Sequence, residues 1–328
     1  MKSQAIAPAK VILTGEHFVV YGAPAIVSAV DIHSNTTASK RRDQRIVVKS
    51  SSPECTISIK DGRCEVLRGG EIAQSLLEPI SVLAQATLQR FGDQCNGLNL
   101  HIESDIPVGV GLGSSAAVAV SAIAAIERLL RKRNDLETIR QLAFESERLI
   151  HKTPSGIDQT ISTFGGIIVY RKEKPFRRIN LKHTFPIIIG DTGKRRSTGE
   201  MVSKVRKLLA ERDDVAKKVM GSAQTISRRA LLTLRRGDRR ELGELMNQNH
   251  ELLRQIEVST EDLERLVSAA REAGAFGAKL TGAGGGGCMI AVSSPNHLDD
   301  VQQAIRDSGG TPHLARIELR GVRSWLVT

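Results

Sequence analysis

The chain has 328 residues, of which 40% are hydrophobic and 25% charged, and its formal net charge is +11 at pH 7. This is the composition of a folded, soluble protein with one large or two ordinary domains. The N-terminus has no apolar stretch of signal-peptide length, and the longest apolar run, 116–126, is interrupted by Ser121. We therefore expect neither secretion nor a membrane span, and a cytoplasmic location.

The cysteines and the basic residues exclude further classes of protein. Cys55, Cys64, Cys95 and Cys288 form no CxxC pair and no zinc spacing, which predicts free thiols and no structural metal. The basic residues come in short scattered groups and aromatic residues make up only 3% of the chain. Without stacking platforms we expect a generally basic surface and no nucleic-acid partner, although anionic substrates benefit from that field.

The first half of the chain alternates short strands with helices. Periodicity and turn residues predict strands at 11–13, 46–49, 56–59, 98–103 and 167–170, and helices at 75–91, 114–132 and 136–151. The basic, proline-containing segment 171–178 then breaks the pattern. This break predicts two domains, residues 1–175 and residues 176–328.

The second half begins with a predicted strand and continues as a mostly helical region. The expected elements are a strand at 186–190, helices within 199–273, a strand at 288–292, a helix at 296–307 and a terminal strand pair at 315–319 and 324–327. Two α+β lobes follow from this order, with a small-molecule site between them.

The stretch IPVGVGLGSSAAVAVSAIAAI, residues 106–126, opens like a phosphate loop and continues as an apolar helix. Gly109, Gly111 and Gly113 let the backbone approach a ligand, and Ser114 or Ser115 can cap the helix. The helix start then favours an anion. The loop lacks a Walker lysine, and an ordinary glycine turn with a serine cap is the alternative.

A second glycine-rich stretch, TGAGGGGCMIAV, covers residues 281–292. Four consecutive glycines can form a flexible linker. Because an apolar strand follows directly, we favour a tight backbone turn packed against a ligand.

Two carboxylates lie on or just after the predicted helix 136–151. Glu147 shares the apolar face of Ile139, Leu142, Ala143 and Ile150, where a charge is expensive unless it is paired or bound to a metal. Asp158 follows a Pro-Ser-Gly turn, so both carboxylates can converge on one pocket. A buried salt bridge explains the same pattern equally well.

The stretch PAKVILTGEHFVVYGAPAI, residues 8–26, places Lys10 on the first strand and Glu16 and His17 after the turn at Gly15. Strand ends that meet loops often carry catalytic groups. Taken one at a time, a Lys, a Glu and a His are more often ordinary surface or structural residues.

The motifs PAKVILTGEH, PVGVGLGSSAA, PSGID and KLTGAGGGGC occur in this order between Pro8 and Val292. Taken together they resemble the GHMP small-molecule kinase family. Within the family, GEHFVVYG at 15–22, ESERLIHKTPSGIDQTISTFGG at 145–166 and IGDTGKRRST at 189–198 are most similar to the mevalonate kinase branch in its archaeal form.

The resemblance implies a two-domain α+β fold with ATP and substrate in the cleft. The N-terminal domain would be α/β of the ribosomal S5 domain 2-like type, and the C-terminal domain ferredoxin-like α+β. The implied ATP loop consists of Pro107, Val108, Gly109, Val110, Gly111, Leu112, Gly113, Ser114, Ser115, Ala116 and Ala117. The implied reaction transfers a phosphoryl group to the 5-hydroxyl of mevalonate, by an enzyme that is commonly a homodimer.

The resemblance also implies roles for single residues. Ser115 and Glu147 would bind Mg²⁺. Asp158 would act as catalytic base on the mevalonate hydroxyl, with Lys10 as the cation beside it, keeping the carboxylate ionised. The residues expected to touch mevalonate or to shape the cleft beside the transferred phosphoryl group are Glu16, His17, Thr198, Thr281 and Gly282.

The chain departs from the family pattern at Ala9, where glycine is common, and in the strongly basic run 194–196. Arg196 is a candidate for the substrate carboxylate, and a solvated loop is the alternative. Phosphomevalonate kinase and mevalonate 3-kinase are the nearest rival activities. His17 argues against the first, and the intact Lys10 and Asp158 argue against the second. A non-catalytic sensor of ATP and a small ligand has no need of Asp158.

Overall fold

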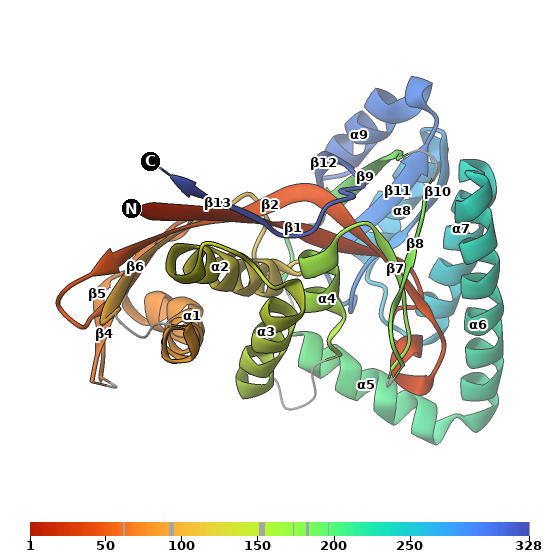
Figure 1. Cartoon of the computed structure of the whole chain (residues 1–328). Coiled ribbons are helices and arrows are strands. Elements are labelled where there is room, and N and C mark those ends of the chain that lie inside the picture. Colours follow the sequence, from red (N-terminus) through yellow and green to blue (C-terminus); the bar gives the residue numbers. More distant parts are fainter. Residues whose placement is uncertain are drawn as a thin grey trace.

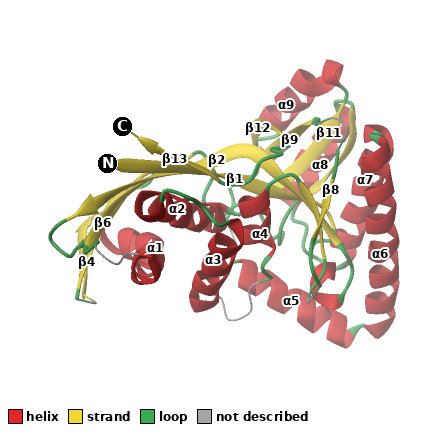
Figure 2. Ribbon diagram, viewed as in Figure 1, coloured by secondary structure: helices red, strands yellow, loops and turns green. Residues whose placement is uncertain are grey.

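The computed structural model describes residues 1–61, 63–91, 95–150, 155–172, 174–181, 184–195 and 197–327. They form two lobes, each a sheet with helices packed on it (Figure 1, Figure 2). We call these the first and second lobe.

The first lobe is built on a long mixed sheet. Its main path runs β13-β1-β2-β6-β3-β4-β5, and β7 joins β2 to β8; the β3–β6 pair is parallel and the others are antiparallel. The strands are β1 (Lys2–Thr14), β2 (Ala25–Arg41), β3 (Ile46–Ser51), β4 (Glu54–Lys60), β5 (Arg63–Arg68), β6 (Gly97–Ser104), β7 (Ile167–Tyr170), β8 (Arg177–Ile179) and β13 (Arg323–Val327). A short 3-10 helix, Phe18–Tyr21, links β1 to β2.

Helices gather on one side of this first sheet, where Figure 2 shows them side by side. They are α1 (Gly70–Phe91), α2 (Ser114–Arg131), α3 (Leu136–Ile150) and α4 (Ile157–Phe164). Almost every residue of α2 from Ala116 to Leu129 is buried, as its apolar sequence predicts.

The second lobe is an antiparallel sheet in the order β10-β11-β9-β12, surrounded by helices. Its strands are β9 (Pro186–Asp191), β10 (Ala275–Leu280), β11 (Cys288–Ser293) and β12 (Thr311–Arg316). Its helices are α5 (Thr198–Glu211), α6 (Asp213–Arg236), α7 (Arg239–Gln255), α8 (Glu261–Glu272) and α9 (Leu298–Asp307), with a 3-10 turn at Pro295–His297. Figure 1 shows α6 and α7 side by side at the outer end.

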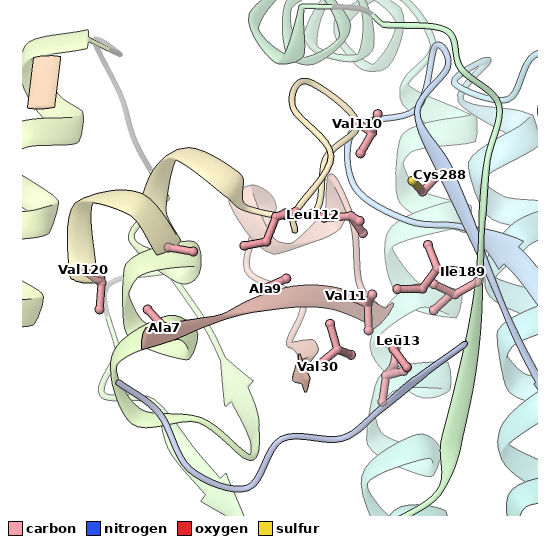
Figure 3. Packing of buried hydrophobic residues seen from close by; sticks show 14 of the residues in the cluster. Ala7, Ala9, Val11, Leu13, Val30, Val110, Leu112, Val120, Ile189 and Cys288 are labelled. Carbon is pink, nitrogen blue, oxygen red and sulfur yellow. The ribbon is translucent and has the colours of Figure 1, made fainter. Parts of the chain in front are cut away.

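One apolar core runs through both lobes along β1. In Figure 3, Ala7, Ala9, Val11 and Leu13 follow one another on β1, from Val120 of α2 towards Ile189 of β9. All of these side chains are fully buried. The first strand therefore belongs to the packing of both lobes, which places its residues at the junction where a site is expected.

The strands and helices predicted in the first half are present, but the pattern missed four strands and the helix α4, and misread the final pair. β2, β5, β8 and β10 were not predicted. The two terminal strands do not pair with each other, because β12 pairs with β9 and β13 pairs with β1. The division after residue 175 stays a prediction. The hydrogen bonds nevertheless bring Arg177–Ile179 and Arg323–Val327 into the first sheet.

The remaining expectations from composition concern the thiols and the membrane. All four cysteines lie in the described ranges and are free thiols, as predicted. No helix in those ranges is long and apolar enough to cross a membrane.

Candidate active site

The glycine loop of residues 107–113 leads from β6 into α2, and Gly113 is the N-cap of the helix. The prediction that Ser114 or Ser115 caps the helix is wrong, because no side chain accepts a hydrogen bond at this cap. Gly113 occupies the left-handed region, with φ of 77°, and takes the cap position itself. The first N–H groups of α2 are therefore available to an anion.

A lysine and an aspartate meet directly beside this helix start. The Lys10 Nζ lies 3.3 Å from Asp158 Oδ1, with the lysine side chain 6% exposed and the aspartate 28% exposed. A Cβ added at Gly113 would stand 2.9 Å from Lys10 Cγ and 3.6 Å from Asp158 Oδ2. Only glycine lets the start of α2 approach the pair this closely.

Backbone contacts hold the three elements of this pair in place. The Lys10 N–H donates to the Leu112 carbonyl at 2.9 Å, which fixes the glycine loop against β1. The Ser162 hydroxyl donates to the Pro8 carbonyl at 2.8 Å, which fixes α4 against the same strand. Lys10, the glycine loop and Asp158 are thus mutually positioned by bonds to one strand.

Glu147 lies on the inward face of α3, as its spacing predicts, while Glu145 and Arg148 are exposed. Burial, followed by the negative charge of Asp158, raises the pKa of Glu147 to about 8, and Lys10 partly offsets this. Its Oε2 is buried without a hydrogen-bond partner, and among the described residues Glu147 has no ion pair. The buried salt bridge considered from the sequence is therefore not formed within the described ranges.

Each of the four glycines of residues 284–287 packs closely against neighbouring segments on the side where a Cβ would stand, so this stretch is no linker. A Cβ at Gly284 would stand 2.3 Å from the Val258 carbonyl oxygen, and one at Gly287 would stand 2.7 Å from the Val110 carbonyl oxygen. The second contact brings this run against the loop of residues 107–113. A small pocket lies between them, lined by Gly109, Val110, Gly111, Thr198, Thr281, Ala283, Gly284, Gly286 and Gly287.

The structure brings several predicted substrate residues to this junction. Thr198 begins α5 and lines the pocket together with Thr281. Gly282 packs against the backbone of Gly111. His17 stands beside the pocket, with Nε2 2.8 Å from the Ala283 carbonyl oxygen, and burial lowers its pKa. Their contacts with substrate stay predictions.

Glu16 is different, because the residue is 1% exposed and its carboxylate already has partners. Its Oε1 is ion-paired with Lys279, and its Oε2 accepts a hydrogen bond from Asn249 Nδ2 at 3.0 Å. Burial lowers the pKa of Lys279, and the neighbouring Glu16 opposes that shift. None of the motifs pointed to a role for Lys279 or Asn249. Lys279 could have been noticed as the single cation in the apolar strand AFGAKL, because a buried cation requires a partner.

Parts of the predicted site lie outside the described residues. These are Arg196, residues 151–153 and Pro154, the first residue of the PSGID motif. Of the basic run, Lys194 pairs with Asp262 at 3.2 Å, and the side chain of Arg195 lies along Gly109.

The arrangement suits the transfer of an anionic group to a hydroxyl. A helix start without a side-chain cap, next to a glycine-rich loop, can hold phosphate oxygens. The partly exposed Asp158 beside a cation can accept a proton or orient a hydroxyl. Within the part of the chain that the structure describes, Glu147 offers a carboxylate oxygen without a partner near the same pair.

Two family models match the chain. GHMP kinases N terminal domain covers residues 79–166, and GHMP kinases C terminal covers residues 230–311. Together they include the glycine loop, Glu147 and Asp158 in the first lobe, and Thr281 with its glycine run in the second.

Relatives match over the full chain. A mevalonate kinase of Pyrococcus furiosus is 39% identical over 98% of both chains. Among solved structures, the Methanococcus jannaschii mevalonate kinase is 28% identical, with a TM-score of 0.84 over 96% of this chain and 98% of that one. The L. major mevalonate kinase in complex with R-mevalonate is 30% identical, with a TM-score of 0.82 over 95% and 94%. The chain therefore belongs to the GHMP kinase family.

Proposed function

We propose that the protein is an ATP-dependent kinase that phosphorylates the 5-hydroxyl of mevalonate and so supplies 5-phosphomevalonate to isoprenoid biosynthesis. The observation that carries the proposal is the Lys10–Asp158 pair, 3.3 Å apart, against the start of α2, which has no side-chain cap. Full-length identity of 39% to an archaeal mevalonate kinase supports the choice of substrate.

Asp158 is the group that handles the proton of the attacking hydroxyl. Its carboxylate is partly exposed, so a substrate hydroxyl can reach it, and Lys10 keeps a positive charge beside it. In a loose phosphoryl-transfer transition state, orienting the hydroxyl in line matters as much as removing its proton. Lys10 also attracts the negative charge that develops on the attacking oxygen.

The ATP phosphates would lie on the loop of residues 107–117. Backbone N–H groups at the start of α2 and the left-handed glycines provide donors without a Walker lysine. The lysine of this site comes instead from β1 and faces the acceptor side, next to Asp158. The glycine run of residues 284–287 closes the other wall of the pocket.

The residues present fit a divalent cation. The orphaned buried oxygen of Glu147 and the exposed hydroxyl of Ser115 are oxygen donors of the kind that Mg²⁺ prefers. Glu147 and Ser115 would hold the ion, which when bound neutralises charge on the β- and γ-phosphates. A nearby cation also favours the ionised form of Glu147, whose pKa is otherwise raised to about 8.

The substrate end of the site would be formed by His17, Thr198, Thr281 and Gly282, which all lie around the junction of the two glycine loops. We further propose that the enzyme works in the cytoplasm as a homodimer. The family resemblance motivates this assembly, and the oligomeric state in solution tests it.

The test is product analysis with purified protein, Mg²⁺-ATP and one acceptor at a time: mevalonate, 5-phosphomevalonate, homoserine or galactose. We expect ADP release with mevalonate and a phosphate on its 5-oxygen, read by ³¹P NMR. A phosphate on the 3-oxygen, or turnover of 5-phosphomevalonate instead, would assign one of the rival kinase activities. Binding of ATP without turnover of any acceptor would point to a sensor.

A further inference from the structure

One edge of β1 is filled by groups from outside its sheet. In the described part of the chain β13 pairs only with residues 2–6 of this strand. Further along, the N–H of Lys10 donates to Leu112, and the N–H of Ile12 donates to Thr281 Oγ1 at 2.9 Å. Because buried backbone groups must be paired, these contacts replace a neighbouring strand.

Lys279 completes this replacement from the second lobe. Its ammonium donates to the carbonyl oxygens of Ile12, at 3.4 Å, and Leu280, at 2.6 Å, and it pairs with Glu16. Both members of the ion pair are 0% exposed at the side chain. Separating the two side chains would leave an uncompensated buried charge. Lys279 and Glu16 are therefore held in contact.

Asn249 of α7 also binds the turn after β1. Its Nδ2 donates to Glu16, and its Oδ1 accepts from the N–H of Gly15 at 3.2 Å. The turn after β1 is thus bound to α7 and β10, two elements of the second lobe. Lys279 directly precedes Leu280 and Thr281, where the glycine-rich wall of the pocket begins.

From these contacts we propose that Lys279 is a positioning residue for phosphoryl transfer. With Glu16 and Asn249 it forms an interlobe lock that holds β1, which carries Lys10, at a fixed distance from the Thr281–Gly287 loop. The proposal rests on the kinase function proposed above. It also assigns Glu16 to the lock and not to substrate contact, because both of its carboxylate oxygens are already engaged.

Amide hydrogen exchange tests the lock without any substrate. The N–H groups of Ile12 and Gly15 bond to side chains of the second lobe and report directly on it. In the double variant Glu16→Gln/Lys279→Met, which removes both charges together, we expect exchange at residues 12–15 to quicken at least tenfold. Amides in the middle of α2 should change less than twofold. Unchanged protection at residues 12–15 would overturn the proposal.

Steady-state kinetics of the same double variant test the positioning role. We expect kcat to fall at least tenfold while KM for mevalonate changes less than threefold. Val301→Ala controls for a loss of stability alone, because it shortens a fully buried side chain on α9 of the same lobe. The two variants are compared at a temperature where both are fully folded. The control should keep kcat within twofold of the unaltered protein.

The remaining outcomes separate the two proposals. A tenfold rise in KM for mevalonate with unchanged kcat would show that Glu16 contacts the substrate directly. It would overturn the positioning role of Lys279. An unchanged kcat and KM would also overturn it. If the unaltered protein fails to phosphorylate mevalonate, the proposed function is wrong, whereas the exchange of residues 12–15 still decides whether the lock exists.

Discussion

Two lysine–carboxylate pairs lie along β1 and the turn after it, and they differ in burial. The Lys10–Asp158 pair has a partly exposed carboxylate and a 3.3 Å separation. The Glu16–Lys279 pair is sealed from solvent, and a second side chain, Asn249, also binds the carboxylate. The same two functional groups therefore stand in different surroundings, because solvent can reach only the first pair.

The difference also lies in what each pair connects. Lys10 and Asp158 both belong to the first lobe, where one strand and one short helix present them to a ligand. Glu16 and Lys279 come from different lobes. An open pair within one lobe can change its proton and ligand state during a reaction, whereas a closed pair between lobes fixes distance.

The sharpest expected effect is the loss of the open carboxylate. Asp158→Asn keeps the shape but cannot accept a proton, so we expect kcat to fall about 10²–10⁴-fold. A coupled assay of ADP release measures this, with Asp300→Asn, a surface change on α9, as control. Activity within threefold of the unaltered protein would remove Asp158 from the mechanism.

For stability we expect the opposite order: breaking the buried Glu16–Lys279 pair should destabilise the protein more than breaking the Lys10–Asp158 pair. Lys279→Met leaves the Glu16 charge buried without a partner and should destabilise the protein by about 3–5 kcal/mol. Lys10→Met leaves Asp158 partly hydrated, so the loss should stay below about 1 kcal/mol. Urea unfolding at pH 7 compares them. Equal losses would show that the burial difference does not matter.

The next prediction concerns Glu147 and whether its carboxylate acts together with Lys10 and Asp158. Its folded pKa of about 8 exceeds the ordinary value of 4.5, so the folded state holds the proton more tightly. Without metal, stability should fall as pH rises from 4.5 to 8 and then level off. Glu147→Gln should lack this loss and weaken Mg²⁺-dependent activity about 10–100-fold.

The matched control for this carboxylate is Glu145→Gln, because Glu145 is exposed on the same helix. It should keep both the activity and the pH dependence of stability measured by thermal unfolding between pH 5 and 9. An identical pH profile in Glu147→Gln and the unaltered protein would contradict the raised pKa.

The smallest effect is expected at Gly113, the N-cap residue that lets the start of α2 lie close to Lys10 and Asp158. Gly113→Ala places a methyl group 2.9 Å from Lys10 Cγ at φ of 77°, which should cost about 1–2 kcal/mol of stability and displace Lys10. Gly221→Ala, inside α6 with nothing within 4 Å, should instead stabilise by up to about 1 kcal/mol. Urea unfolding and kcat/KM distinguish the two.

The open pair could be predicted from the sequence, and the closed pair could not. The placement of Lys10 beside Asp158 came from the resemblance of their motifs to the GHMP kinase family. Helical periodicity placed Glu147 correctly on the inward face of its helix. The partnership of Glu16 with Lys279 joins residues 263 positions apart. Such a contact follows from how two lobes pack, which no local pattern encodes.

The missed strands have a similar physical cause. β2 includes the polar run DIHSNTTASKR, which lacks a strand-like apolar alternation, yet it pairs with β1, β6 and β7. Tertiary hydrogen bonding overrides weak local preference there. The expected serine cap failed because Gly113 must sit close to Lys10, and that neighbour is remote in sequence.

The pairing of β13 with β1 has a consequence for synthesis of the protein. Lys2 lies opposite Val327, and Arg128 and Asn134 hold Ser324 against the first lobe. The edge of the first sheet therefore stays open on the ribosome until the second lobe has been made. A nascent chain that carries the glycine loop and Asp158 but lacks β13 leaves one edge of β1 unpaired at residues 2–6, and unpaired strand edges favour aggregation.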